Sequence, residues 1–200
     1  MTVAAPRERD VRRLSAWAES RGLKFTHILL DGGLTPSQPM VTRHARGTLD
    51  GEIAAARDLA AGLAGVGLAV CRIKIEVAAD HDDAPRRDDQ ADGQPSDRHF
   101  EHHVKLLLPV EASLERIARL AWPHGGHVSR NARKRREDGR QERFVTQRCY
   151  GVGSETAGQR FERLVEALSA DGIEILDTER EYVVYDDNAV IDAGWIASAR

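Results

Sequence analysis

The sequence is poor in aromatic residues and in cysteine, and it contains no long apolar run. Aromatic side chains make up 5% of its 200 residues, and there are two cysteines. Small secreted domains usually rely on several disulfides, so Cys71 and Cys149, each inside a strand-like pattern, indicate buried thiols in a reducing compartment. The first residues lack the apolar segment of a signal peptide, and no stretch approaches the length of a membrane span. These absences predict a soluble, cytoplasmic protein with no membrane partner.

Motifs that would name a reaction are absent as well. The chain has no glycine-rich phosphate loop, no nucleophile elbow, no Cys-x-x-Cys pair and no zincin helix. No cofactor is identified from the sequence, and a divalent metal enters only through the spacing of histidines and carboxylates. The motifs therefore decide neither for nor against an enzyme.

The charge balance disfavours a nucleic-acid partner. The formal net charge is −3 at pH 7, whereas nucleic-acid-binding domains are commonly basic. The arginine-rich stretch 129–143 also contains Glu137, Asp138 and Glu142, and it lacks aromatic residues on which bases could stack. We interpret this stretch as a solvated hairpin loop.

Hydrophobic periodicity divides the chain into alternating helices and strands. In the first part we expect a helix at 10–20, strands at 24–33 and 38–47, a helix capped by Asp50 and ending near Ala64, and a strand at 68–78. A polar, acidic and turn-rich segment follows at 80–98. In the second part we expect strands at 98–109, 127–132, 142–151 and 173–187, a helix at 111–121, and a helix at 154–170 that begins at a Ser154 cap.

The two parts of the chain resemble each other. At an offset of 104 residues, Val41 and Thr42 match Val145 and Thr146, and with one further residue of slip the later helices and strands also agree. We interpret this pattern as an internal duplication. It predicts an α+β fold of two ferredoxin-like halves, with a mainly antiparallel sheet and helices packed on one face.

The predicted organisation has three parts within one continuous structural domain. They are a first half at 1–79 with an N-terminal helix, a flexible acidic linker at 80–98, and a second half at 99–200.

The stretch RHFEHHVKLLLP brings three histidines to the start of one predicted strand. The period of two places His102 on the apolar face with Val104, and His103 on the polar face with Glu101 and Lys105. We therefore expect loss of His102 to cost stability, and we expect His103 to be the histidine available for chemistry.

Alternation gathers charged and hydroxyl side chains on the same polar face of the predicted sheet. The candidate ligand-binding residues are Arg72, Lys74, Glu101, Lys105, Thr42, Thr146, Arg148, Glu179 and Glu181. Arginine and lysine can fix phosphate or carboxylate groups, and carboxylates can bind hydroxyls or a metal. The competing interpretation is a solvated sheet face with cross-strand ion pairs, each worth little.

The length and the duplicated α+β organisation are similar to those of the two-histidine phosphoesterases. Each lobe of that family offers a His-x-Thr/Ser tripeptide on a strand, one histidine acting as general acid and the other as general base. Here the corresponding tripeptides are HIL at His27 and HVK at His103, neither of which has the hydroxyl residue. The resemblance implies His27 and His103 as catalytic candidates. Alternation matches His27 to His102 instead, so a bulge or register shift would be required.

Two further sets of residues suit a metal. His124 and His127 lie three apart around a Gly-Gly turn, a spacing used by zinc and nickel sites that have additional ligands. A turn that ends a helix accounts for the two glycines without any metal. The cluster at 186–188 has cation-binding oxygens, but aspartate and asparagine are also ordinary turn residues.

The leading hypothesis from the sequence is a protein that binds a small anionic ligand, with phosphorylated molecules as one class, on its polar sheet face. The alternatives are a histidine-dependent phosphoesterase or metal-assisted hydrolase, and a protein–protein interaction module. Sheets of this kind often pair through their edges, so a homodimer is compatible with the sequence.

Overall fold

A single nine-stranded sheet organises the chain, and its described neighbouring strands all pair antiparallel. The computed structural model describes residues 1–131 and 137–196; part of the predicted arginine-rich loop, at 132–136, lies outside the described residues. The strands are β1 (Thr2–Ala4), β2 (Lys24–Leu30), β3 (Ser37–Thr42), β4 (Ala69–Arg72), β5 (Lys74–Ala78), β6 (His99–Leu108), β7 (Gly126–Asn131), β8 (Gln141–Tyr150) and β9 (Glu174–Asp186). The prediction of an α+β fold with a mainly antiparallel sheet is confirmed.

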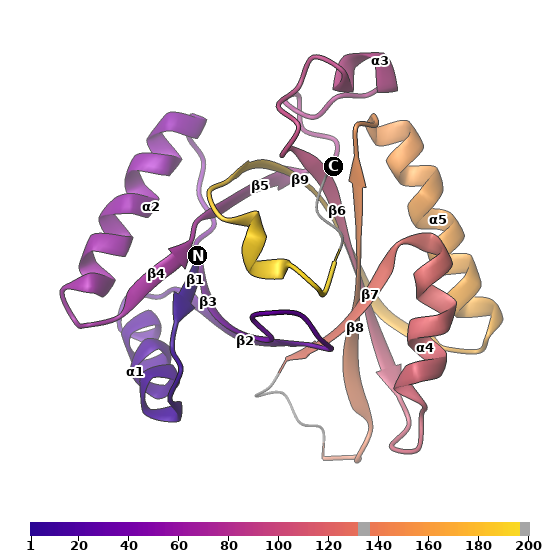
Figure 1. Ribbon diagram of the computed structural model, residues 1–200, viewed down its shortest axis with the longest axis horizontal. Coiled ribbons are helices and arrows are strands. Elements are labelled where there is room, and N and C mark those ends of the chain that lie inside the picture. The colour runs from indigo at the N-terminus through magenta and orange to yellow at the C-terminus, as the bar shows by residue number, and fades with distance from the viewer. Residues whose placement is uncertain (132–136, 197–200) are drawn as a thin grey trace.

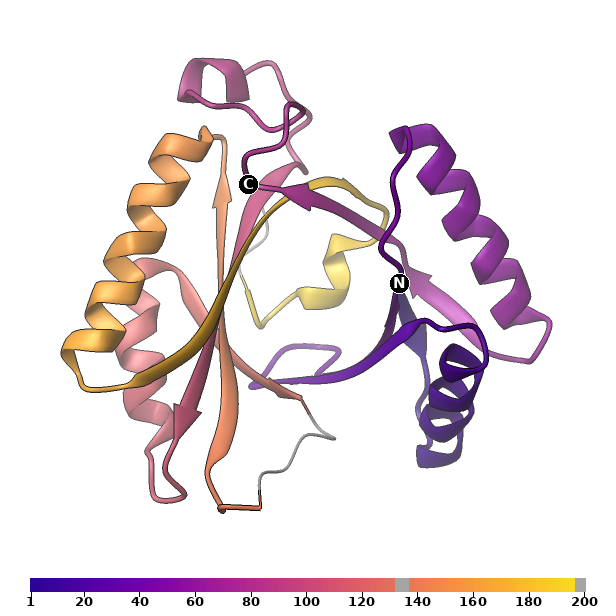
Figure 2. The ribbon, with the colours of Figure 1, turned by 180° about the vertical axis from the view of Figure 1, so that it is seen from behind.

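The helices lie mostly on one side of this sheet. They are α1 (Glu8–Glu19), α2 (Leu49–Ala64), α3 (Asp88–Ala91), α4 (Leu114–Ala121), α5 (Ser154–Ala170) and the 3₁₀ helices η1 (Trp122–His124) and η2 (Ala189–Asp192). Figures 1 and 2 show α1 and α2 outside one half of the curved sheet and α4 and α5 outside the other half, whereas η2 lies within the curve.

The two end strands of the sheet, β4 and β5, are consecutive in the sequence, so the sheet curls back on itself. Only Ile73 separates β4 from β5, yet β4 pairs with β1 and β5 pairs with β9 at the other end of the strand order. Asp187 fixes this junction twice: its backbone N–H donates to the Ile73 carbonyl (3.2 Å), and its Oδ1 accepts from the Ile73 N–H (2.7 Å). The predicted strand at 68–78 is therefore two strands, and the sheet forms a ring with an inner and an outer face (Figure 1).

Both halves of the chain repeat one order of elements. The first runs β1-α1-β2-β3-α2-β4 and the second β6-α4-β7-β8-α5-β9. In the sheet, the strands of the first half lie in the order β4-β1-β3-β2. Those of the second half lie in the corresponding order β9-β6-β8-β7 when the sheet is read from its other end. The halves meet where β2 pairs with β7 and where β5 pairs with β9.

Two predicted helix starts are wrong for local reasons. The N-cap of α2 is Thr48, whose Oγ1 accepts from the backbone N–H of Gly51 at 3.3 Å, so Asp50 lies inside the first turn. The helix expected from residue 111 begins at Leu114, because Ser113 is its N-cap and a turn precedes it. In both cases a hydroxyl satisfies an N–H that the helix itself leaves unpaired.

The second predicted strand is also shorter than expected. It was expected to reach residue 47, but β3 ends at Thr42. Thr42 pairs with Lys24, which is the first residue of β2, so the neighbouring strand offers no further partners beyond this point.

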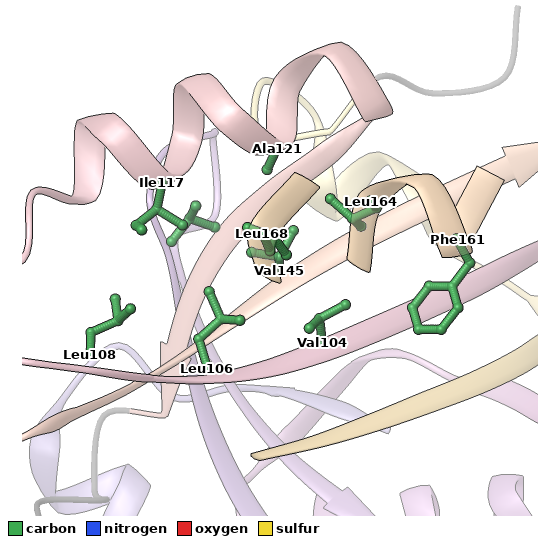
Figure 3. Close-up of a cluster of buried hydrophobic side chains, with 10 residues drawn as sticks. Val104, Leu106, Leu108, Ile117, Ala121, Val145, Phe161, Leu164 and Leu168 are labelled. Carbon is green, nitrogen blue, oxygen red and sulfur yellow. The ribbon is translucent and has the colours of Figure 1, made fainter. Parts of the chain in front are cut away.

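The apolar core of the second half lies between the outer face of the sheet and the helices α4 and α5 (Figure 3). The buried residues of this cluster are Val104, Leu106, Leu108, Ile117, Ala121, Val128, Val145, Phe161, Leu164 and Leu168. In the first half, α1 and α2 bury Leu14, Trp17 and Leu63 against Val3 and Val41. Because successive strand residues point to opposite faces, an apolar outer face leaves the intervening, largely polar positions on the inner face.

The acidic segment 80–98 contacts the beginning of α5. Asp88, in the short helix α3, accepts hydrogen bonds from the backbone N–H of Gly153 (2.8 Å) and from the Thr156 hydroxyl (3.0 Å). The N–H of Ser154 donates to the Pro85 carbonyl at 2.8 Å. The predicted Ser154 cap is thus wrong: Gly153 is the N-cap, and the Pro85 and Arg86 carbonyls accept from the N–H groups of Ser154 and Glu155, which Gly153 has no side chain to cap.

The contact between this segment and α5 can be tested with Gly153→Ala. A Cβ at Gly153 would lie 2.4 Å from the Arg86 carbonyl oxygen, which is backbone and cannot swing away. We expect a loss of about 1–3 kcal/mol in the free energy of unfolding, measured by urea denaturation. Gly32→Ala is the control, because a Cβ there meets nothing within 4 Å. Equal stability of the two variants would contradict the docked position of the segment.

Candidate functional site on the inner face of the sheet

The strand β6 separates the histidines as its alternation predicts. His102 points to the outer, apolar side and is fully buried against the Phe161 ring, with the ring centroids 4.8 Å apart. His103 is on the inner face with Glu101, and its side chain is 25% exposed. His99, at the start of β6, is buried and stacks on Tyr150 with the ring centroids 4.5 Å apart.

Glu101 is the most connected carboxylate of the inner face. Its Oε1 lies 2.7 Å from Lys74 Nζ and 3.3 Å from His103 Nε2, and its Oε2 lies 2.6 Å from Arg148 Nε and 3.4 Å from His99 Nε2. Burial alone would raise the pKa of Glu101, but Arg148 and Lys74 outweigh burial and hold it well below its ordinary value. Glu101 is therefore a buried anion at neutral pH.

A second carboxylate, Asp192, enters this face from η2. Its Oδ2 lies 2.8 Å from Arg72 Nη1 and 2.6 Å from Arg148 Nη2, and its Oδ1 accepts from Gln38 Nε2 at 2.8 Å. Burial would raise the pKa of Asp192, but Arg148 and Arg72 lower it overall. Arg72 also pairs with Asp186 through its Nε and Nη2.

The resulting chain of alternating charges is called the inner network here. Its members are Asp186, Arg72, Asp192, Arg148, Glu101, Lys74 and Glu76. They come from β4, β5, β6, β8, β9 and η2, so the network connects strands from both halves of the ring. Hydrogen-bonded charges can be buried in this way because each charge has an opposite partner.

Three titratable side chains converge at the more open end of the inner network. Glu76, His103 and Glu181 each place one donor atom within 4.8 Å of the other two. Burial and the Glu76 carboxylate raise the pKa of Glu181 to about 7. Burial would lower the pKa of His103, but the hydrogen bond with Glu101 raises it above its ordinary value.

Of the predicted ligand-binding residues, most gather on the inner face and two lie apart from its contacts. Arg72, Lys74, Arg148 and Glu101 belong to the inner network; Thr146 contacts His103, with Oγ1 3.0 Å from Nδ1; Glu181 is in the group of three. Lys105 pairs with the buried Glu142 at 3.2 Å. Thr42 and Glu179 are exposed.

The predicted partner of His103 lies elsewhere in the sheet. His27 is on β2, where its Nε2 lies 2.8 Å from Ser37 Oγ, and the strands β7 and β8 separate β2 from β6. His127 packs between the indole rings of Trp122 and Trp195, at 5.3 and 6.0 Å between centroids. The backbone carbonyl of His124 accepts from Gln147 Nε2 at 2.7 Å.

Sequence patterns did not point to Asp192, Gln38 or His99 as parts of this site. Asp192 lies in a tail with no strand or helix periodicity, and nothing in its local sequence indicates that η2 folds back inside the ring. Asp186 looked like a turn residue, yet it is a buried partner of Arg72. One signal was available in the sequence: strand alternation places Arg72 and Arg148 on the same polar face. Arginines that become buried there require carboxylate partners from elsewhere in the chain.

Comparison of the chain with protein-family models, with curated proteins and with solved structures found no match in any of the three. None of the helices in the described part of the chain combines the length and apolar character needed to cross a bilayer.

The dependence of the ring on Glu101 can be tested with Glu101→Gln. This change leaves half-buried Lys74 and the buried side chain of Arg148 with one fewer anionic partner, so we expect a loss of about 3–5 kcal/mol in the free energy of unfolding. The matched control is Glu179→Gln, which neutralises an exposed carboxylate on the neighbouring strand β9 and should change stability by less than about 0.5 kcal/mol. Urea denaturation at pH 7 measures both; similar small losses would contradict the importance of the inner network.

A pH dependence follows from His102. Burial lowers its pKa from 6.5 to about 4, so the unfolded chain takes up a proton between these values and the folded chain does not. Stability should therefore fall as the pH drops from about 7 to 4.5, by roughly 2–3 kcal/mol from this group. In His102→Asn, which keeps a donor for Gln147, that part of the loss should vanish. Parallel stability curves for the variant and the unmodified chain, from urea denaturation at several pH values, would contradict this assignment.

Proposed function

We propose that the chain binds a small anionic ligand, a phosphate ester or a carboxylate, on the inner face of the ring. The observation that supports this most is the environment of the Asp192 carboxylate. Two guanidinium groups and one amide, from Arg72, Arg148 and Gln38, donate to its two oxygens. Paired arginines with an amide are a common arrangement for recognising carboxylate and phosphate groups.

Each arginine in this arrangement is held in place by a different carboxylate. Arg72 is anchored through its Nε and Nη2 by Asp186, and Arg148 through its Nε by Glu101. Only one N–H group of each arginine is directed at Asp192. The donors would therefore keep their positions if Asp192 left, which is the preorganisation that a binding site requires.

Asp192 comes from a short segment and not from the sheet. The helix η2 has four residues, and its neighbouring contacts include the hydrogen bond from Trp195 Nε1 to the Val128 carbonyl at 2.9 Å. In this proposal Asp192 fills the position of the ligand's anionic group, and a shift of η2 admits the ligand. The cations of the inner face are otherwise paired, so an anion has no better position there.

A metal-assisted hydrolase is the second candidate function. It is favoured by the convergence of Glu76, His103 and Glu181 within 4.8 Å at the open end of the same face. A phosphoesterase that uses His27 with His103 has less support, because β7 and β8 lie between their strands. The interaction-module alternative is favoured by exposed apolar residues such as Leu34 and Trp122.

We also infer that the chain consists of two duplicated ferredoxin-like halves. The shared order of elements and the shared strand order of the two halves support this inference. A cytoplasmic location, the lack of a nucleic-acid partner and a homodimer remain predictions from the sequence. Pairing through sheet edges would have to use β4 or β5, which are only four and five residues long.

The proposed anion site can be tested with Asp192→Asn. The variant removes the resident anion but keeps its shape, so inorganic phosphate should raise the melting temperature of the variant more than that of the unmodified chain, where Asp192 competes. At 100 times the dissociation constant the expected stabilisation is about 2.7 kcal/mol. Differential scanning calorimetry with EDTA present and chloride at matched ionic strength measures the effect.

Two controls separate a specific site from a general effect of phosphate. Gly153→Ala lowers stability through backbone that lies away from Arg72 and Arg148, and it should respond to phosphate like the unmodified chain. Adding Arg148→Met to Asp192→Asn should abolish the extra stabilisation. The proposed function would be overturned if phosphate raised the melting temperature of Gly153→Ala as much as that of Asp192→Asn. It would also be overturned if Asp192→Asn showed no extra response to phosphate.

A further inference from the structure

The group formed by Glu76, His103 and Glu181 has the geometry of a metal site. The three residues lie on β5, β6 and β9, which are adjacent in the sheet, and each contributes one donor atom to a cluster that spans at most 4.8 Å. Their side chains are 24 to 25% exposed, in contrast with the 4% of Glu101 beside them. An ion could therefore reach this group from solvent while the rest of the inner network stays buried.

The imidazole of His103 is supported on the side away from this group. Its Nδ1 lies 3.0 Å from Thr146 Oγ1, and its Nε2 lies 3.7 Å from Glu181 Oε2. A hydroxyl can accept a hydrogen bond from Nδ1–H, so a metal ion that displaces the Nε2 proton shared with Glu101 would meet the lone pair of Nε2. Ligating histidines usually have such a partner on their second nitrogen.

The charges of the inner face also favour a cation at this point. Within the inner network the cations are Arg72, Lys74 and Arg148, and the carboxylates are Glu76, Glu101, Asp186 and Asp192. The carboxylates outnumber the cations by one before Glu181 is added. Lys74 lies between Glu76 and Glu101, with its Nζ 2.5 and 2.7 Å from their Oε1 atoms, and no described ion pair joins a lysine or arginine to Glu181.

We propose that Glu76, His103 and Glu181 bind a divalent first-row transition-metal ion. One imidazole with two carboxylates suits ions such as Mn²⁺, Zn²⁺ or Fe²⁺, whereas Ca²⁺ and Mg²⁺ take oxygen ligands alone. Water would complete the coordination, as in open sites. This site contains neither His124 nor His127, and the ring of His127 contacts those of Trp122 and Trp195 instead.

The metal site goes beyond the proposed anion site and does not depend on it. The two sites use different residues of the inner face, and Glu101 connects them through Arg148 on one side and His103 on the other. An ion at Glu181 would add positive charge to the same face on which the anion is proposed to bind. Each site can be tested with its own probe, the metal without phosphate and phosphate without metal.

The experiment is titration of the EDTA-treated and dialysed full chain with Mn²⁺, Zn²⁺ and Co²⁺, each alone, by isothermal titration calorimetry. We expect one ion per chain, and a Co²⁺ absorption spectrum that differs from that of the aqueous ion. His103→Gln and Glu181→Gln should each weaken binding at least about tenfold. Glu181→Gln changes a partly exposed residue, so it keeps the test valid if His103→Gln fails to fold.

The matched control is Glu179→Gln, which removes a carboxylate two residues along the same strand and outside the group of three. Because Glu179 lies opposite His103 in the sheet and its charge acts on Glu181, a small loss of affinity is expected, well below that of Glu181→Gln, with the Co²⁺ spectrum unchanged. An equal loss in Glu179→Gln would indicate diffuse attraction of cations by an acidic surface and would overturn the proposal. Absence of stoichiometric binding, or binding that survives both ligand substitutions, would overturn it as well.

Discussion

The buried pairing of Glu101 with Arg148 and Lys74 is the interaction on which the rest of the structure depends. Closing a sheet into a ring brings its inner positions together, and in this chain many of those positions are charged. Charges taken out of water are tolerated only when each has an opposite partner and good hydrogen-bond geometry. Glu101 provides that partner for cations from β5 and β8 at once, and Asp192 does the same for Arg148 and Arg72.

The closure of the ring and the pairing of its inner charges consequently depend on the same residues. The kink at Ile73 sends β4 and β5 to opposite ends of the strand order, and Asp187 holds that kink through the Ile73 backbone. Next to it, Asp186 anchors Arg72. Residues that look like an ordinary acidic turn in the sequence therefore hold the closure of the sheet, and their carboxylates also position the arginine that contacts η2.

The inner face divides into a part that maintains the fold and a part that is open to chemistry. The side chains of Glu101, Arg72 and Arg148 are almost completely buried, which suits a structural role. His103 and Glu181 lie at the margin of the same face, where solvent reaches them and their neighbours hold them in place. A rigid, buried set of charges beneath a partly exposed set is the arrangement from which binding sites are commonly built.

The sequence by itself determined most of the longer helices and strands, the antiparallel α+β class and the opposite faces of His102 and His103, because these follow from hydrophobic period and local turn chemistry. It did not indicate the short elements β1 and α3. It also placed Arg72, Lys74 and Glu101 on one polar face. Only the tertiary structure decided that this face is enclosed, that β4 and β5 join opposite ends of the sheet, and that Asp192 completes the arginine pair. Those features depend on contacts between residues more than a hundred positions apart, which no local pattern records.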